Sequence, residues 1–327
     1  MKPIKTAVIG VGYLGKFHAQ KFFHIEQSDL IGVCDTNTKQ CQQIASQCKT
    51  KAFHNYRELA GQVDAVCIAT PTPSHYEVAK FFLEKGVHTL IEKPITTTLK
   101  QAEELIQIAK EQKAILQVGH LERFNNVIIE AAPKLISPQY IESHRLAPFQ
   151  LRGTDVNVVL DLMIHDLDII QYLVGADIDT IAASGASILS AYTDVVNARV
   201  EFQNGCVANM TASRVSTHRE RKLHIFQPHG FVTLDLDKKI ISERFKTEKM
   251  IEGGIPEILQ NDRTCEQGDP LMEQAKAFLQ SVASDSPAAV SGTDGKRALK
   301  TAIDITRILH INRAKYEAAH ADQFLSV

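Results

Sequence analysis

A glycine-rich turn near the start of the chain has the residue types and the spacing that bind a phosphate group. It reads G-x-G-x-x-G, follows a short apolar run and opens a helical pattern, and its residues are Gly10, Val11, Gly12, Tyr13, Leu14 and Gly15. Asp35 ends the next apolar run, twenty positions after Gly15. The glycine motif alone is weak evidence, but in this context it is the dinucleotide-binding pattern.

Each glycine of the turn has a physical role in that pattern. Gly10 permits a tight turn, Gly12 lets the backbone approach a pyrophosphate, and Gly15 allows the helix to pack close to the strand. The free N–H groups at the start of the helix, together with its dipole, then hold the phosphates.

Asp35 decides which dinucleotide the pattern favours. Its carboxylate accepts hydrogen bonds from the adenosine ribose and repels a 2′-phosphate, so we predict NAD as the cofactor, with Thr36 beside it. NADP is the weaker alternative, which the nearby Lys39 would admit.

Further polar residues follow directly after apolar runs. They are Thr70, Pro71 and His75 after residues 65–69, Glu92 and Lys93 after residues 87–91, and His120 and Arg123 after residues 115–118. Ligands of parallel sheets lie beyond the carboxyl ends of the strands, so we expect these segments to converge at the cofactor. We place Lys93 nearest the nicotinamide, since packing does not explain a lysine at the end of a buried strand; elsewhere it would be a surface charge.

A second group of chemically active residues lies on a helical pattern at residues 161–174. Asp161 and His165 are four positions apart, so a helix projects them from one face, amid an otherwise apolar surface. The alternative is that the two side chains merely pair with each other.

These residues suit the oxidation of an alcohol. That reaction needs a base for the hydroxyl proton while hydride leaves the carbon, and an imidazole titrates near neutrality. Burial and a neighbouring cationic nicotinamide would disfavour the charged form of Lys93. We therefore expect Lys93 and His165 to share the proton transfer, with Asp161 orienting the imidazole.

The elements that must position these residues follow from the apolar pattern. Short apolar runs at residues 7–9, 30–34, 65–69, 87–91 and 115–118 alternate with helical patterns, which predicts a doubly wound parallel sheet of the Rossmann type. We assign residues 1–121 to this dinucleotide-binding domain. We assign residues 122–327 to an α/β domain for substrate binding and oligomerisation, whose closing helix can pack back on the first domain.

The second domain shows strand patterns separated by turns. The predicted strands are residues 178–189, 197–202, 206–212, 223–226 and 231–236, with a hairpin signal at Asn204-Gly205. We predict a largely antiparallel open sheet, helices at residues 270–284 and 294–313, and a long loop at residues 247–268, where no pattern is visible.

Composition excludes several classes of partner. The net charge of −2 gives no footprint for nucleic acid. The one dense basic run, residues 214–222, is typical of a solvated strand or loop, and the alternative is an anion-binding site. No signal peptide or membrane span is visible, so we expect a cytoplasmic protein. The six cysteines are scattered and lack zinc spacing, so no metal site is predicted.

The chain resembles the Gfo/Idh/MocA oxidoreductase family over nearly its whole length. Three motifs carry the resemblance: the G-x-G-x-x-G turn, the E-K-P segment at residues 92–94 and the D-x-x-x-H segment at residues 161–165. The segments at residues 69–75 and 291–300 add to the resemblance. It implies bound NAD(P), catalytic roles for Lys93, Asp161 and His165, a cis Lys93–Pro94 bond, and dimer contacts through the open sheet. A homodimer or homotetramer is expected.

A narrower resemblance concerns residues 118–125 and 144–156, which look like UDP-N-acetylglucosamine 3-dehydrogenases. It implies oxidation of the sugar C3 hydroxyl with NAD, before a partner aminotransferase supplies an amino sugar for lipid A. Candidate contacts to the sugar or pyrophosphate are His120, Arg123, Arg145 and Arg152. The alternatives are a dehydrogenase of free sugars or inositol, an NAD-dependent glycosidase, and a non-catalytic NAD-sensing protein.

Overall fold

A computed structural model describes residues 2–150 and 156–320 of the chain. Contacts divide the chain into two units, each with its own sheet. Unit 1 comprises Met1–Phe124 and Asp269–Leu299, and unit 2 comprises Asn125–Gly268 and Lys300–Val327. The domain boundary that we predicted after residue 121 lies three residues before the first of these divisions.

Unit 1 contains a six-stranded sheet in the order β3-β2-β1-β4-β5-β6, in which every pair is parallel. Its strands are β1 (Ile4–Ile9), β2 (Ser28–Cys34), β3 (Lys51–Phe53), β4 (Ala65–Ile68), β5 (His88–Glu92) and β6 (Leu116–Gly119). This is the Rossmann strand order, as predicted. The sequence pattern missed only β3, because a three-residue edge strand with partly exposed side chains carries no continuous apolar run.

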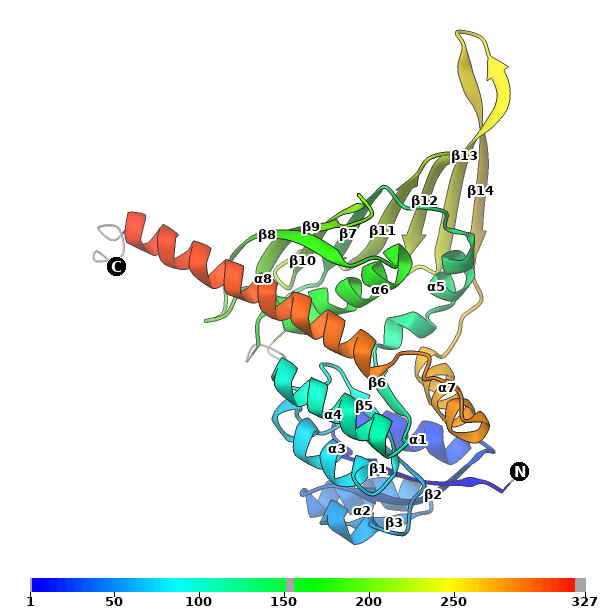
Figure 1. Ribbon diagram of the computed structural model, residues 1–327, viewed down its shortest axis with the longest axis vertical. Helices are drawn as coiled ribbons and strands as arrows, with labels where there is room; N and C mark the ends of the chain where they lie inside the picture. Colours follow the sequence, from blue (N-terminus) through cyan, green and yellow to red (C-terminus); the bar gives the residue numbers. More distant parts are fainter. Residues whose placement is uncertain (1, 151–155, 321–327) are drawn as a thin grey trace. The chain divides into compact units, whose positions relative to one another are not determined.

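Helices cover both faces of this sheet (Figure 1). They are α1 (Gly15–His24), α2 (Thr38–Gln47), α3 (His75–Leu83), α4 (Leu99–Glu111) and α7 (Pro270–Ser284), with 3₁₀ turns η1 (Tyr56–Leu59), η2 (Thr72–Ser74) and η3 (Leu121–Phe124). Phe22 of α1, Ile44 of α2 and Phe278 of α7 pack in one buried cluster with Val8 of the sheet. Helix α7 has the predicted bounds, because Asp269 caps its start by accepting the Met272 N–H.

Unit 2 contains an eight-stranded sheet in the order β14-β13-β12-β11-β7-β10-β9-β8. Its strands are β7 (Tyr140–Leu146), β8 (Ile178–Ala186), β9 (Val195–Phe202), β10 (Val207–Ser213), β11 (Glu220–Gln227), β12 (Gly230–Asp235), β13 (Ile240–Ile251) and β14 (Ile255–Thr264). Only β7 and β10 pair in parallel, so the predicted largely antiparallel sheet is confirmed. The predicted Asn204-Gly205 hairpin joins β9 to β10, with Gly205 at φ 84°.

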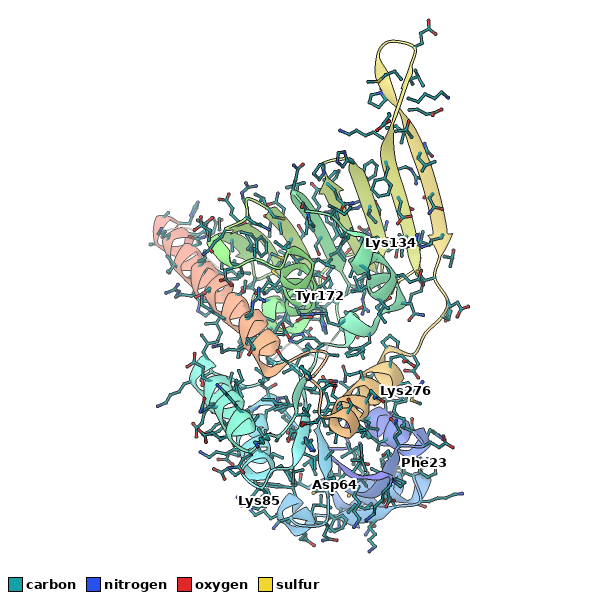
Figure 2. The ribbon with its side chains drawn as sticks, turned by 45° about the vertical axis from the view of Figure 1, so that its right-hand side comes forward. Phe23, Asp64, Lys85, Lys134, Tyr172 and Lys276 are labelled. Carbon is teal, nitrogen blue, oxygen red and sulfur yellow. The ribbon has the colours of Figure 1, made fainter. Side chains whose placement is uncertain are left out.

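The prediction of a long loop at residues 247–268 is wrong, because most of this segment belongs to two strands. It forms the last part of β13 and the whole of β14. Gly253 and Gly254 make the turn with φ 88° and 73°, the conformation that a tight hairpin turn requires. Side chains project from both faces of the hairpin tip in Figure 2, and Ile255 is 57% exposed. With neither face buried, the strands show no alternation of apolar and polar residues.

The helices of unit 2 include α5 (Asn126–Ala131), the 3₁₀ turn η4 (Ala132–Lys134), the π-helical turn η5 (Val159–Met163) and α6 (Ile164–Val174). Figure 1 shows α5 and α6 along one face of the eight-stranded sheet, whose buried side chains include Ile141 and Met210. Helix α8 (Gly292–Ala319) begins in unit 1 and continues in unit 2. All six cysteines are buried free thiols, and no helix in the described part of the chain is long and apolar enough to cross a membrane.

Candidate functional site

The three glycines of the turn after β1 meet the steric demands predicted for them. Gly10 has φ 83°, and a Cβ there would lie 2.7 Å from the Thr70 nitrogen. A Cβ at Gly15 would lie 1.8 Å from the Gly10 carbonyl oxygen, so α1 packs directly on the turn. A Cβ at Gly12 would meet nothing within 4 Å. Gly12 therefore borders open space rather than protein, as a backbone that receives a pyrophosphate must.

Asp35 lies at the carboxyl end of β2 and holds this turn in place. One carboxylate oxygen accepts the Val11 N–H at 2.8 Å, and the other accepts the Asn37 N–H at 2.8 Å. The side-chain amide of Gln40 donates to the Val11 carbonyl at 2.7 Å. The residue predicted to recognise the ribose thus also orders the loop that would hold the phosphates.

The carboxyl ends of β4 and β5 bring Thr70, His75 and Lys93 into one region of unit 1. The ring nitrogens of His75 lie 2.8 Å from the Thr70 carbonyl and 2.9 Å from the Pro94 carbonyl. The Lys93–Pro94 peptide bond is cis, as predicted. The hydroxyl oxygen of Thr70 is buried and has no hydrogen-bond partner within the described residues.

These observations fit a bound dinucleotide. Such ligands bind at the edge of the sheet formed by the carboxyl ends of its strands. At that edge lie the open space at Gly12, the Asp35 carboxylate and the Thr70 hydroxyl, which has no partner among the residues that the structure describes. The other cofactor candidates share this edge and are solvent-accessible to different degrees; they are Tyr13 and Leu14 at the start of α1, Thr36 after β2 and Pro71 after β4.

A buried ion pair beside Lys93 was not predicted. Nε2 of His18, on α1, lies 2.7 Å from Oε1 of Glu92, and the His18 side chain is fully buried. Burial by itself lowers the pKa of His18, but Cys67 and Glu92 raise it to about 10. Burial raises the pKa of Glu92, whereas the hydrogen bond and the charge of His18 lower it. The net effect is a lowered pKa. The available signal was a histidine on the buried face of the helix that follows the glycine turn.

Asp161 and His165 lie in unit 2, and their relation to Lys93 stays a prediction. Both are half-buried. The helix predicted from residue 161 is regular only from Ile164 on, because Asp161 belongs to the π-helical turn η5. Apolar spacing over so few residues does not distinguish a wider turn from an α-helical one, and such turns are frequent at functional sites.

The start of η5 is held by side chains from distant parts of unit 2. Asn157 accepts the Leu160 N–H at 3.0 Å and donates to Thr306 of α8 at 3.1 Å. Arg214 donates to the Val156 carbonyl at 2.7 Å, and its guanidinium pairs with the buried Asp194 at 2.8 Å. The backbone before Asp161 is therefore fixed by buried polar contacts.

The four candidate substrate contacts differ in their surroundings. Arg145, on β7, is 2% exposed and pairs with Asp166, the neighbour of His165, at 2.6 Å. We therefore propose for Arg145 a role in holding α6 rather than in contacting substrate. A guanidinium nitrogen of Arg123 lies 3.8 Å from a carboxylate oxygen of Asp294. The side chain of His120 is buried, with 1% of its surface exposed. Arg152 lies outside the described residues.

Comparison with known proteins identifies the family. Residues 4–120 match the model of an oxidoreductase family with an NAD-binding Rossmann fold, and residues 142–233 match the Gfo/Idh/MocA C-terminal domain. A relative from Acidithiobacillus ferrooxidans, named UDP-N-acetylglucosamine 3-dehydrogenase, is 35% identical over 92% of this chain and 96% of its own. The chain belongs to the Gfo/Idh/MocA oxidoreductase family. It is therefore an oxidoreductase with an NAD-binding domain, and the glycine turn and Asp35 lie within the matched Rossmann region.

Solved structures and a further relative were also compared with this chain. A solved structure of the A. ferrooxidans enzyme superposes with a TM-score of 0.89 and covers 94% of this chain and 98% of its own. The scyllo-inositol 2-dehydrogenase of Bacillus subtilis is 28% identical over 66% of this chain and 68% of its own. The scyllo-inositol dehydrogenase of Lactobacillus casei, solved with NAD(H) and scyllo-inositol, has a TM-score of 0.80 at 21% identity, covering 95% and 98%, and shows the shared fold.

Proposed function

We propose that this oxidoreductase removes hydride from the C3 hydroxyl carbon of UDP-N-acetylglucosamine. The observation that carries the proposal is the 35% identity, over 92% of the chain, with a relative named for that reaction. The narrower sequence resemblance at residues 118–125 and 144–156 supports the same substrate.

The residues divide the chemistry between them. The open backbone at Gly12, the Asp35 carboxylate and the Thr70 hydroxyl would hold NAD, which accepts the hydride when bound. Lys93 and His165 share the transfer of the single proton that leaves the substrate hydroxyl, and Asp161 orients the imidazole. These catalytic roles are proposals from residue chemistry and from family resemblance.

The test is NADH formation, followed by absorbance, with UDP-N-acetylglucosamine, free N-acetylglucosamine and myo-inositol side by side. We expect the nucleotide sugar to give a kcat/KM at least about tenfold higher than the other two, a difference of about 1.4 kcal/mol. Mass spectrometry of the product should show loss of two hydrogens from the sugar. Equal turnover of the free and the UDP-linked sugar would contradict the proposed substrate.

The second candidate function is an inositol dehydrogenase, favoured by the 28% identity with the B. subtilis relative. Preferred turnover of myo-inositol in the same assay would establish it. Loss of substrate without NADH accumulation would instead indicate a glycosidase that returns the hydride, and NAD binding without turnover of any of the three would indicate a sensing protein.

We further propose a homodimer or homotetramer that works in the cytoplasm. The open sheet supports the oligomer, because Tyr140, Phe226 and Phe231 form a row of neighbouring rings on it, and the last two are 36% and 40% exposed. Exposed apolar rows of this kind are typical of protein interfaces. The six buried thiols suit a reducing compartment. Supply of an amino-sugar precursor for lipid A stays a prediction.

A further inference from the structure

The backbone around Lys93 is held by a side chain on its amino side. Oε2 of Glu92 accepts the Lys93 N–H at 3.1 Å, while Oε1 of the same carboxylate accepts from His18 Nε2 at 2.7 Å. Glu92 is 8% exposed and His18 is fully buried, so both oxygens are committed inside the protein. The carboxylate therefore links helix α1 to the residue that follows β5.

Gly119 leaves the space that this carboxylate occupies. A Cβ on Gly119, at the end of the neighbouring strand β6, would lie 2.9 Å from both carboxylate oxygens and from the carbon between them. That distance is shorter than real Cβ contacts allow, so any other residue at position 119 would push the carboxylate aside. The position of Glu92 is thus enforced from two elements at once.

A second side chain holds the same segment from its carboxyl side. Nδ1 of His75 lies 2.9 Å from the Pro94 carbonyl oxygen, and Nε2 lies 2.8 Å from the Thr70 carbonyl oxygen. The ring is 1% exposed, and this burial lowers the pKa of His75. The ring lies within hydrogen-bond distance of both the segment after β4 and the segment after β5, and in its neutral form it donates its one N–H to one of them.

We propose that Glu92 and His75 are positioning residues that set where the Lys93 amine lies, by fixing the backbone of Lys93 and Pro94 from both ends. Glu92 accepts the Lys93 N–H, and a ring nitrogen of His75 lies against the Pro94 carbonyl, so both residues hold the main chain that carries the amine. Misplacing a reacting group by about 1 Å can cost about 100-fold in rate. The inference rests on the proposed catalytic role of Lys93.

The variants are Glu92→Gln, Glu92→Ala and His75→Ala, with Gly119→Ala as a variant that changes no member of the network. Two controls alter a carboxylate and an imidazole that accept backbone N–H groups at the opposite end of the sheet. Asp64→Asn changes a carboxylate that accepts the Lys5 N–H at 2.9 Å, and His88→Ala removes a ring that accepts the Ile115 N–H at 2.9 Å. Asp64 is labelled in Figure 2.

We expect kcat to fall about 10- to 100-fold in Glu92→Ala, His75→Ala and Gly119→Ala. The Kd for NAD should change less than about threefold in Glu92→Ala and Gly119→Ala. In His75→Ala it should change more, because the ring also contacts the Thr70 segment, but by a smaller factor than kcat. Glu92→Gln keeps one acceptor oxygen and should retain more turnover than Glu92→Ala. The Asp64 and His88 controls should keep the parental kcat. Equal losses in network and control variants, or equal losses in kcat and in NAD affinity, would reduce the network to a general structural role.

A measurement without cofactor separates this inference from the proposed function. The rate at which the Lys93 amine is acetylated in the apo protein, followed by mass spectrometry with Lys85 as internal reference, should change at least about threefold in the network variants and stay constant in the two controls. An unchanged acetylation rate in both Glu92→Ala and His75→Ala would overturn the positioning proposal. Full turnover by Lys93→Met would instead overturn the catalytic role of Lys93, whatever the acetylation rates show.

Discussion

At the scale of single residues, one side chain is expected to recognise the cofactor and also orders the loop that would bind it. Asp35 is the residue expected to accept hydrogen bonds from the ribose, yet both of its oxygens already accept backbone N–H groups, from Val11 and Asn37. Charge-assisted hydrogen bonds of this kind are about twice as strong as neutral ones. The same carboxylate therefore orders the glycine turn before any ligand arrives, which links cofactor choice to loop geometry.

This dual role predicts the outcome of changing Asp35. Asp35→Ala should lower NAD affinity about 10- to 100-fold, because it removes the ribose acceptor and frees the turn, and it should not produce tight NADP binding. Titration calorimetry with both cofactors measures this. Asp29→Ala, an exposed carboxylate at the other end of β2, is the control. NADP binding in Asp35→Ala as tight as NAD binding in the parent would contradict the ordering role.

The catalytic assignment of Lys93 gives a second prediction. Lys93→Met removes the amine while keeping a long side chain, so kcat should fall about 10²- to 10⁴-fold, the usual contribution of a proton-transferring group. NAD affinity should change little, because the glycine turn and Asp35 are untouched. Steady-state kinetics and cofactor titration check both parts, with Lys85→Met, an exposed lysine labelled in Figure 2, as control. Turnover within about threefold of the parent would refute the assignment.

At the scale of elements, the glycine turn and helix α1 contain positions that differ in how much space they leave for a side chain. Gly15 is pressed against the Gly10 carbonyl, whereas Gly12 faces open space. Further along α1, His18 reaches the carboxylate at the end of β5. Helix α1 therefore packs on the glycine turn at its start and, through His18, is hydrogen-bonded to the strand β5 that precedes Lys93.

Two alanine substitutions in the turn should separate binding from folding. Gly12→Ala should leave the apo unfolding midpoint unchanged or slightly higher, while NAD affinity falls at least about tenfold, because its Cβ fills the approach to the pyrophosphate. Gly15→Ala should destabilise the apo protein by about 1–3 kcal/mol, since α1 must move away from the turn. Thermal unfolding and cofactor titration measure the two effects. Unimpaired NAD binding by Gly12→Ala would count against the pyrophosphate site.

The His18–Glu92 pair predicts a pH dependence of stability. The pKa of His18 is about 10 when folded and about 6.5 when unfolded, so its stabilisation is complete below about pH 6.5 and is lost as the pH rises towards 10. Between these values the folded state binds more protons, and the free energy of unfolding falls by at most about 1.4 kcal/mol per pH unit.

The matching variant is His18→Gln, which can still donate to Glu92 but does not titrate. Urea unfolding across this pH range should show a shallower decline of stability in His18→Gln than in the parent. A decline of the same slope in both proteins would show that other groups cause it.

At the scale of the whole molecule, two sheets of different construction carry the two sets of site residues. The parallel sheet of unit 1 is buried between helices, and the open sheet of unit 2 presents the aromatic row at Tyr140, Phe226 and Phe231. The exposed tip of the β13–β14 hairpin adds apolar side chains such as Ile258 and Leu259, which are 49% and 60% exposed. Exposed apolar side chains of this kind are typical of protein interfaces, which supports the proposed association.

Association should be visible in the molar mass. Light scattering coupled to size exclusion should give two or four times the chain mass of 36.3 kDa. Phe226→Lys with Phe231→Glu should lower that mass by placing charge in the aromatic row, whereas Lys134→Glu, at a surface lysine labelled in Figure 2, should not. A monomeric parent protein would contradict the proposed assembly.

Sequence alone predicted the parts of this protein that local pattern encodes. The glycine turn, Asp35, the buried parallel strands, the Asn204-Gly205 hairpin and the bounds of α7 all follow from spacings of a few residues, because backbone sterics, capping and strand burial act over that range. The parts that escaped prediction have weak local patterns. The β13–β14 hairpin lacks a buried face, β3 is too short, and η5 replaces one turn of regular helix.

Only the tertiary structure decided which polar residues became partners. His18 and Glu92 are 74 positions apart, and Arg145 and Asp166 are 21 apart, yet each pair is buried and bonded. Family resemblance suggested Arg145 as a substrate contact, and its buried pairing with Asp166 was not visible in the sequence. Burying a charge is costly unless a partner is brought to it, and only the packing of a helix on a sheet brings that partner.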